Sequence, residues 1–157
     1  MSQPQDLLRV VALLVRHEES IAKLYATFAA KCSGHEKFWG DLAEDEMEHA
    51  NSLRAVHALI ENGRVAMEER KFNLKALQTS LDYLKVLLAN AEKGISHARA
   101  VAMALQVENS MRENAFFEAS DGDGEELKSV LTKLGKSDSA HTQRLRKAMG
   151  ERKADRA

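Results

Sequence analysis

The chain has 157 residues, enough for one domain of ordinary size that buries its own core. Hydrophobic residues make up 44% and charged residues 30%, which excludes a disordered or a membrane-embedded chain. With 8 Gly and 1 Pro, the sequence has too few turn-forming residues for a β-sandwich or barrel, so the composition favours long helices. The net charge of -1, without a basic stripe, argues against a nucleic-acid partner.

The start of the chain predicts neither a membrane segment nor a secretory signal. The apolar run over residues 10–15 is too short to span a bilayer. Asp6 precedes this run and no small-residue cleavage site follows it, so we expect no signal peptide and no membrane partner. The single cysteine, Cys32, cannot form a disulfide within the chain or supply the paired cysteines of a Cys-rich metal domain. We therefore expect a cytoplasmic protein.

Apolar residues recur every three or four positions and predict two long helices in the first half of the chain. These helices cover about residues 6–32 and 36–62, and the short link between them makes them antiparallel neighbours. A connector over residues 63–73 leads to a shorter helix, which ends before Gly94. The apolar stripe of this shorter helix consists of Leu74, Leu77, Leu81, Leu84 and Leu88.

The second half predicts two more long helices, over about residues 96–118 and 125–149, with a D-G-D-G turn between them. The chain thus consists of two helical hairpins joined by the long segment 63–95. This layout predicts an all-α, ferritin-like four-helix bundle with a long crossover that contains an extra short helix. One domain covers residues 1–157, with a core over about 6–150 and a charged tail, 151–157, that we expect to fray.

Each of the four long predicted helices has ionisable residues on its apolar seam, where a core residue is expected. The pattern L-x-x-x-E-x-x-H-x-x-x-L at residues 42–53 is repeated as L-x-x-x-D-x-x-H-x-x-x-L at residues 134–145. The helix that precedes each copy contributes a single seam carboxylate. In chain order the seam residues are Glu18, Glu46, His49, Glu108, Asp138 and His141.

The spacing predicts that these six side chains meet at one height of the bundle. Glu18 lies about 15 residues before the first turn and Glu46 about 13 after it, or roughly 22 and 20 Å along the two helices. Four carboxylates and two imidazoles cannot converge in a dry core unaided, because burying an unpaired carboxylate is very costly. Two divalent cations remove this cost. The ligand types suit iron, manganese or zinc, and the absence of thiolates argues against a structural zinc site.

Other arrangements of these residues remain open. The seam positions are solvated polar faces instead if the assignment is wrong by one residue. The second copy of the pattern is the weaker one, because Gly135 costs about 1 kcal/mol inside a helix and Ser137 can cap a new helix. Asp138 then lies in a first turn and does not face the core. The remaining histidines are expected at helix ends or facing solvent; they are His17, His35, His57 and His97.

Residues 18–49 read E-x6-Y-x2-F-A followed by W-x2-L-A-x2-E-x2-H, which resembles the rubrerythrin branch of the ferritin-like superfamily. The resemblance extends over roughly residues 7–150. It implies a non-haem di-iron oxidoreductase that reduces peroxide, or reacts with dioxygen, in oxidative-stress defence. It also implies that the hydroxyl of Tyr25 hydrogen-bonds a ligand carboxylate, whereas the apolar pattern alone makes Tyr25 a core aromatic residue.

Three features depart from the rubrerythrin pattern. Asp138 stands where the family has Glu, which shortens the reach of the side chain by about 1.5 Å. Met111 occupies the place of a second carboxylate, so the family's exchange of ligands during the redox cycle is not implied. No rubredoxin-like domain follows, and we therefore expect a separate electron-donor protein.

Two ions are expected to be bridged by Glu46 and Asp138, although the shorter Asp138 binds one ion only unless its helix moves inward. Iron oxidation and storage is an alternative function, and a non-redox bundle that holds zinc or manganese is another. The leucine stripe of the extra helix either covers the bundle or packs against a second copy, so we expect a homodimer or larger assembly.

Overall fold

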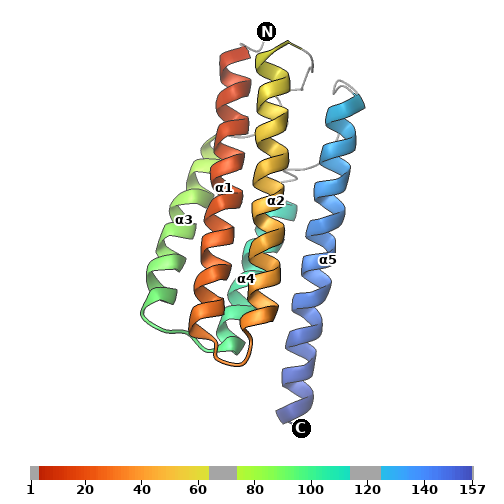
Figure 1. Ribbon diagram of the computed structural model, residues 1–157. Coiled ribbons are helices and arrows are strands. Elements are labelled where there is room, and N and C mark those ends of the chain that lie inside the picture. The colour runs from red at the N-terminus through yellow and green to blue at the C-terminus, as the bar shows by residue number, and fades with distance from the viewer. Residues whose placement is uncertain (1–3, 64–73, 114–124, 157) are drawn as a thin grey trace.

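The computed structural model describes residues 4–63, 74–113 and 125–156 (Figure 1). Helices are the only regular secondary structure in these three ranges, which confirms the all-α class. The helices are α1 (Pro4–Lys31), α2 (Glu36–Glu61), α3 (Leu74–Glu92), α4 (His97–Glu113) and α5 (Glu125–Arg156).

The helices lie side by side and alternate in direction along the chain (Figure 1). The largest interface joins α1 to α2; α3 packs along α1, and α5 packs against α4 and α2. Because α3 leads the chain back along the bundle, α2 and α4 run in the same direction and do not form a hairpin (Figure 1). The extra helix that the sequence predicts between the two hairpins is therefore present, and it lies on the outside of α1.

The ends of the helices follow the local signals in the sequence. Gly63 and Gly94 have φ angles of 71° and 118°, a left-handed conformation that strongly favours glycine, and each follows a helix end. The hydroxyl of Ser96 accepts a 3.2 Å hydrogen bond from the backbone N–H of Arg99 and caps the start of α4.

The last helix is longer than predicted. It continues to Arg156 without a break, so residues 151–156 of the charged tail are helical, and their expected fraying stays a prediction. It also passes through Gly135 and Ser137, which excludes a restarted helix at Ser137. The predicted end of the preceding helix at residue 118 lies outside the described residues.

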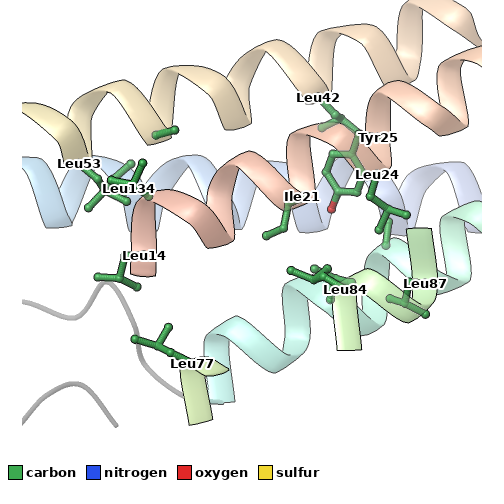
Figure 2. Close-up of a cluster of buried hydrophobic side chains, with 14 of the residues drawn as sticks. Leu14, Ile21, Leu24, Tyr25, Leu42, Leu53, Leu77, Leu84, Leu87 and Leu134 are labelled. Carbon is green, nitrogen blue, oxygen red and sulfur yellow. The ribbon is translucent and has the colours of Figure 1, made fainter. Parts of the chain in front are cut away.

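The core lies where the apolar periodicity places it in α1, α2 and α5, and α3 covers a second side of α1. Figure 2 shows Leu77, Leu84 and Leu87 of α3 facing apolar side chains of α1, and all three are buried. Of the leucine stripe that suggested a homodimer, Leu77, Leu81 and Leu84 are thus buried within the chain, and Leu74 and Leu88 are half-buried. Self-association itself stays a prediction.

The buried face of α4 differs in part from its sequence seam, which runs through Ala98, Val101, Leu105 and Glu108. Ala98 and Leu105 are only half-buried, because α4 turns a neighbouring row of smaller side chains towards the core. The residues buried on α4 are Ala100, Val101, Ala104, Val107 and Glu108. None of the helices in the described ranges is long and apolar enough to cross a membrane.

Candidate metal centre

The six ionisable seam residues come together inside the bundle, and four helices contribute to the cluster. Glu18 comes from α1, Glu108 from α4, and α2 and α5 each provide one carboxylate and one histidine. Five of the six residues are at least 94% buried, and the side chain of Asp138 is 17% exposed. The buried five are Glu18, Glu46, His49, Glu108 and His141.

The six residues form two overlapping groups that share Glu46. One group consists of Glu18, Glu46 and His49, and the other of Glu46, Glu108, Asp138 and His141; the ligand atoms of each group lie within 4.8 Å of one another. Ligands that share a metal ion approach it to about 2.0–2.2 Å, so a small contraction brings either group to coordination distance.

Glu46 lies between the two histidines. The Nδ1 atom of His49 is 3.3 Å from Oε2 of Glu46, and the Nδ1 atom of His141 is 3.1 Å from Oε1. Its two oxygens therefore face different imidazoles, as in a carboxylate that bridges two ions. Asp138 belongs to the group around His141, and its Oδ1 atom also lies 3.9 Å from Nδ1 of His49.

The outer carboxylates each face one histidine. Oε2 of Glu18 lies 3.7 Å from Nδ1 of His49, and Oε1 of Glu108 lies 3.6 Å from Nδ1 of His141. The rings of the two histidines are stacked, with centroids 5.5 Å apart. The cluster thus has an approximate internal symmetry that matches the repeat in the sequence.

The second nitrogen of each histidine fixes the orientation of its ring. Nε2 of His141 donates to Asp45 at 3.0 Å, and Nε2 of His49 is 2.8 Å from the hydroxyl of Ser137. A hydrogen bond at Nε2 leaves the lone pair of Nδ1 directed at the carboxylates, the arrangement of metal-ligating histidines. Arg144 supports Asp45 at 3.4 Å.

Sequence reasoning missed Asp45 and Ser137, although the repeat contains the signal. Each residue immediately precedes a motif carboxylate, Glu46 or Asp138, so the two occupy equivalent positions in the two copies. Each contacts the histidine of the other copy. Only the packing of α2 against α5 brings them together, and no spacing rule within one helix predicts that contact.

Tyr25 lies beside the second group, and its ring is fully buried. Its hydroxyl donates a 2.8 Å hydrogen bond to Oε1 of Glu108. Burial and the neighbouring carboxylate of Glu108 both raise the pKa of Tyr25 well above its usual value, so the phenol keeps its proton. The residue is therefore a core aromatic group that also orients a carboxylate of the cluster.

Many oxygen and nitrogen atoms of the cluster have no hydrogen-bond donor or acceptor within the described residues. They are both carboxylate oxygens of Glu18 and of Glu46, Oε2 of Glu108, and the Nδ1 atoms of His49 and His141. Buried polar atoms are normally satisfied, and an ionised carboxylate without a partner is very costly. Cations bound between these atoms would satisfy them, so the donor set fits a metal site.

The pKa values of the cluster residues also reflect an excess of buried negative charge. Burial, and then the charge of Glu46, raise the pKa of Glu18 well above its usual value. Burial also opposes ionisation of Glu46, but short contacts with Glu18 and both histidines hold its pKa below the usual range. Burial disfavours the imidazolium form of His141, yet the carboxylates of Glu108 and Glu46 outweigh this and raise its pKa to about 11. Protons thus occupy the places that metal ions take.

The sequence predicts that His17 lies at a helix end or faces solvent, but in the structure the residue is buried. It lies on the side of α1 that α3 covers, and its Nε2 atom is 2.6 Å from the hydroxyl of Ser80. Burial lowers the pKa of His17 to about 4. The prediction failed because it treated α1 as having one buried face. Of the other three histidines, His35 is exposed, and His57 and His97 are half-buried.

No family model, no curated protein and no solved structure matches this chain. The geometry therefore defines the class by itself: an all-helical protein with a buried cluster of carboxylates and histidines that can hold metal ions.

Proposed function

We propose that this chain is a ferritin-like di-metal protein of the rubrerythrin type, and that its centre reacts with peroxide or dioxygen. The observation that carries the proposal is the position of Glu46, whose two oxygens face two histidines within two overlapping ligand groups. Di-iron carboxylate bundles combine single Glu residues on two helices with a Glu-x-x-His motif on each of two others. This chain has the same set, with Asp138 in place of one Glu.

Two ions would divide the six residues between them. Glu18 and His49 would hold the first ion, Glu108 and His141 would hold the second, and both ions would share Glu46 and Asp138. Iron in both places supplies one-electron redox steps and a Lewis acid for peroxide or dioxygen. The ligand types also accept manganese or zinc, which are the other metals that the test distinguishes.

The chain's own residues position the ligands and exclude water from the centre. Asp45 and Ser137 hold the two imidazoles with Nδ1 inward, and Tyr25 holds one oxygen of Glu108. The surrounding side chains of Ile21 and Leu42 are fully buried. Such a dry shell strengthens electrostatic interactions at the centre and limits side reactions.

Anaerobic titration with ferrous iron, followed by exposure to peroxide, tests this function. We expect saturation at two ions per chain and, after oxidation, the near-ultraviolet absorption of an oxo-bridged ferric pair. With an added reductant, peroxide is consumed repeatedly. Binding of two ions without turnover indicates iron handling or a non-redox bundle, and contradicts the oxidoreductase proposal. A failure to bind two ions contradicts the di-metal assignment.

A further inference from the structure

A row of aromatic rings connects the metal centre to the surface at the end of the bundle where α2 and α4 begin. Tyr25, which is bonded to Glu108, has its ring centroid 5.6 Å from that of Trp39. Trp39 lies 5.7 Å from His97, and His97 is stacked on His35 at 3.5 Å with an interplanar angle of 3°. Trp39 is fully buried, whereas His35 is exposed. The row therefore leads from the core to solvent without a gap.

One contact in this row joins two groups that can exchange a proton. The indole Nε1–H of Trp39 donates a 3.1 Å hydrogen bond to Nδ1 of His97. This contact requires the lone pair of Nδ1, so His97 carries its proton on Nε2. Burial, and then the neighbouring His35, lower the pKa of His97, which favours the neutral ring whose Nδ1 atom accepts the indole hydrogen bond.

We propose that Trp39 and His97 form a proton-coupled electron relay between the metal centre and an electron donor at the surface. The inference rests on the proposed function, because the oxidant is the centre in a state more oxidising than the ferric pair, formed during its reaction with peroxide or dioxygen. Trp39 gives one electron to that oxidant through the adjoining ring of Tyr25, and it transfers its indole proton to Nδ1 of His97. The products are a neutral indolyl radical and an imidazolium.

A one-electron reductant at the surface then completes the cycle. Its electron reaches Trp39 through the stacked rings of His97 and His35, and the imidazolium of His97 returns the proton to the indole nitrogen. Each cycle thus moves one electron from the reductant to the centre and leaves Trp39 and His97 unchanged. An indole that loses an electron becomes strongly acidic, so an acceptor already in hydrogen-bond contact lowers the cost of its oxidation.

The surface end of the relay favours an anionic donor. A pocket there is lined by His35, Phe38, His97, Arg144, Lys147 and Ala148. Arg144, which is paired with Asp45 at 3.4 Å, and Lys147 bring cationic groups to this pocket, and none of the residues that line it is acidic. Opposite charges speed the encounter of small ions and of proteins alike. We therefore expect an anionic one-electron reductant to reduce Trp39 faster than a cationic one.

Trp39 is the only tryptophan of the chain, so its radical can be observed directly. The first test is flash photo-oxidation of the metal-free protein, followed by transient absorption in the visible range. We expect the neutral indolyl radical in the wild type and the protonated radical cation in His97→Phe, because that variant has no proton acceptor. His57→Phe, which changes a half-buried histidine on the same helix as Trp39, should behave as the wild type does.

The radical's protonation state decides this part of the proposal. The same neutral radical in His97→Phe and in the wild type contradicts proton transfer to His97. His97→Gln keeps an oxygen that can accept the indole N–H bond but lacks a comparable base. If His97→Phe fails to fold, a protonated radical in His97→Gln supports the proposal, and a neutral radical overturns it. None of these results depends on the metal centre.

The second test mixes the ferrous-loaded protein with dioxygen in the presence of ascorbate, an anionic donor, and measures the rate at which ascorbate is oxidised. Trp39→Phe should reduce this rate at least tenfold, whereas Tyr83→Phe, at an exposed tyrosine of α3, should leave it unchanged. Iron that binds, with ascorbate oxidised equally fast in Trp39→Phe, overturns the relay but not the proposed function. If the chain binds no iron pair, the proposed function fails, and the flash experiment still decides whether Trp39 and His97 are coupled.

Discussion

The two halves of the metal centre use equivalent residues but support them differently. In the first half, His49 is oriented by the hydroxyl of Ser137. In the second half, His141 is oriented by the carboxylate of Asp45, which Arg144 contacts in turn. The comparison teaches that the two copies of the repeat supply similar carboxylates and imidazoles to the cluster, while the groups that position the imidazoles differ.

The halves also differ in their carboxylates. Glu46 is fully buried and shared, whereas Asp138, its equivalent in the second copy, is 17% exposed and shorter. On the other hand, Glu108 is held by Tyr25, and the described residues supply no such donor to Glu18. The second half thus combines a shorter and more exposed carboxylate with stronger supporting hydrogen bonds, and mutations can separate these two influences.

Removing the shared carboxylate has the largest expected effect. Glu46→Ala should abolish the binding of both ions, because each ligand group contains Glu46. Glu48→Ala, which removes an exposed carboxylate of the same helix, should keep two ions per chain. Metal analysis after iron loading measures both. Two ions in Glu46→Ala contradict its role as a bridge.

Shortening the weaker bridge should affect one half more than the other. Asp138→Ala should lose mainly the ion on His141, and Asp138→Glu should keep or improve the occupancy of that ion, because it restores the missing methylene. Anomalous scattering from crystals of the two variants locates the remaining ions. Two fully occupied ions in Asp138→Ala show that Asp138 is not a ligand, and the repeat then fails in its second copy.

Removing Asp45 or Ser137, which orient the two imidazoles, should have a smaller effect on metal affinity, and this effect should differ between the halves. Asp45→Ala should weaken the ion on His141 by about 10- to 100-fold, since residues that orient a metal-bound histidine typically contribute that much. Ser137→Ala should weaken the ion on His49 by less, because a neutral hydroxyl gives a weaker bond than a carboxylate. Competition with a coloured chelator measures both affinities. Equal losses in the two variants contradict the asymmetry.

The smallest effect concerns the backbone of the second half. Gly135 occupies the position of Ala43 in the repeat and lies inside the continuous helix α5, where a methyl group on its Cα atom would meet open space. Gly135→Ala should therefore raise the free energy of unfolding by about 0.5–1 kcal/mol. Thermal or urea unfolding measures the change. A destabilised variant shows that the close approach of α5 to its neighbours needs a glycine there.

The helices and the six facing residues could be predicted because both depend on periodicity within single helices. The seam of α1 places Glu18 among apolar neighbours, and the repeat relates Glu46 to Asp138 without any knowledge of packing. The contacts of Asp45 and Ser137 could not be predicted in this way, because they cross between α2 and α5. His17 was misplaced for the same reason, since α3 covers a side of α1 that carries no separate signal.

The proposed relay also contains one residue that the sequence pattern predicts as buried and one contact that it does not predict. Trp39 was predicted as a core residue from its place on the seam of α2, and it is buried. Its partner His97 lies 58 positions further along the chain, at the start of α4. The indole hydrogen bond arises only because the first turn of α4 packs beside that of α2. The proposed relay therefore depends on a contact between helices that the sequence pattern leaves open.

The position of the metal ions is the most direct test of the central claim. A crystal structure of the iron-loaded protein, with anomalous data at the iron edge, should show two ions inside the bundle, one on Nδ1 of His49 and one on Nδ1 of His141, with one oxygen of Glu46 on each. A single ion, or ions bound only outside the cluster, would contradict the account.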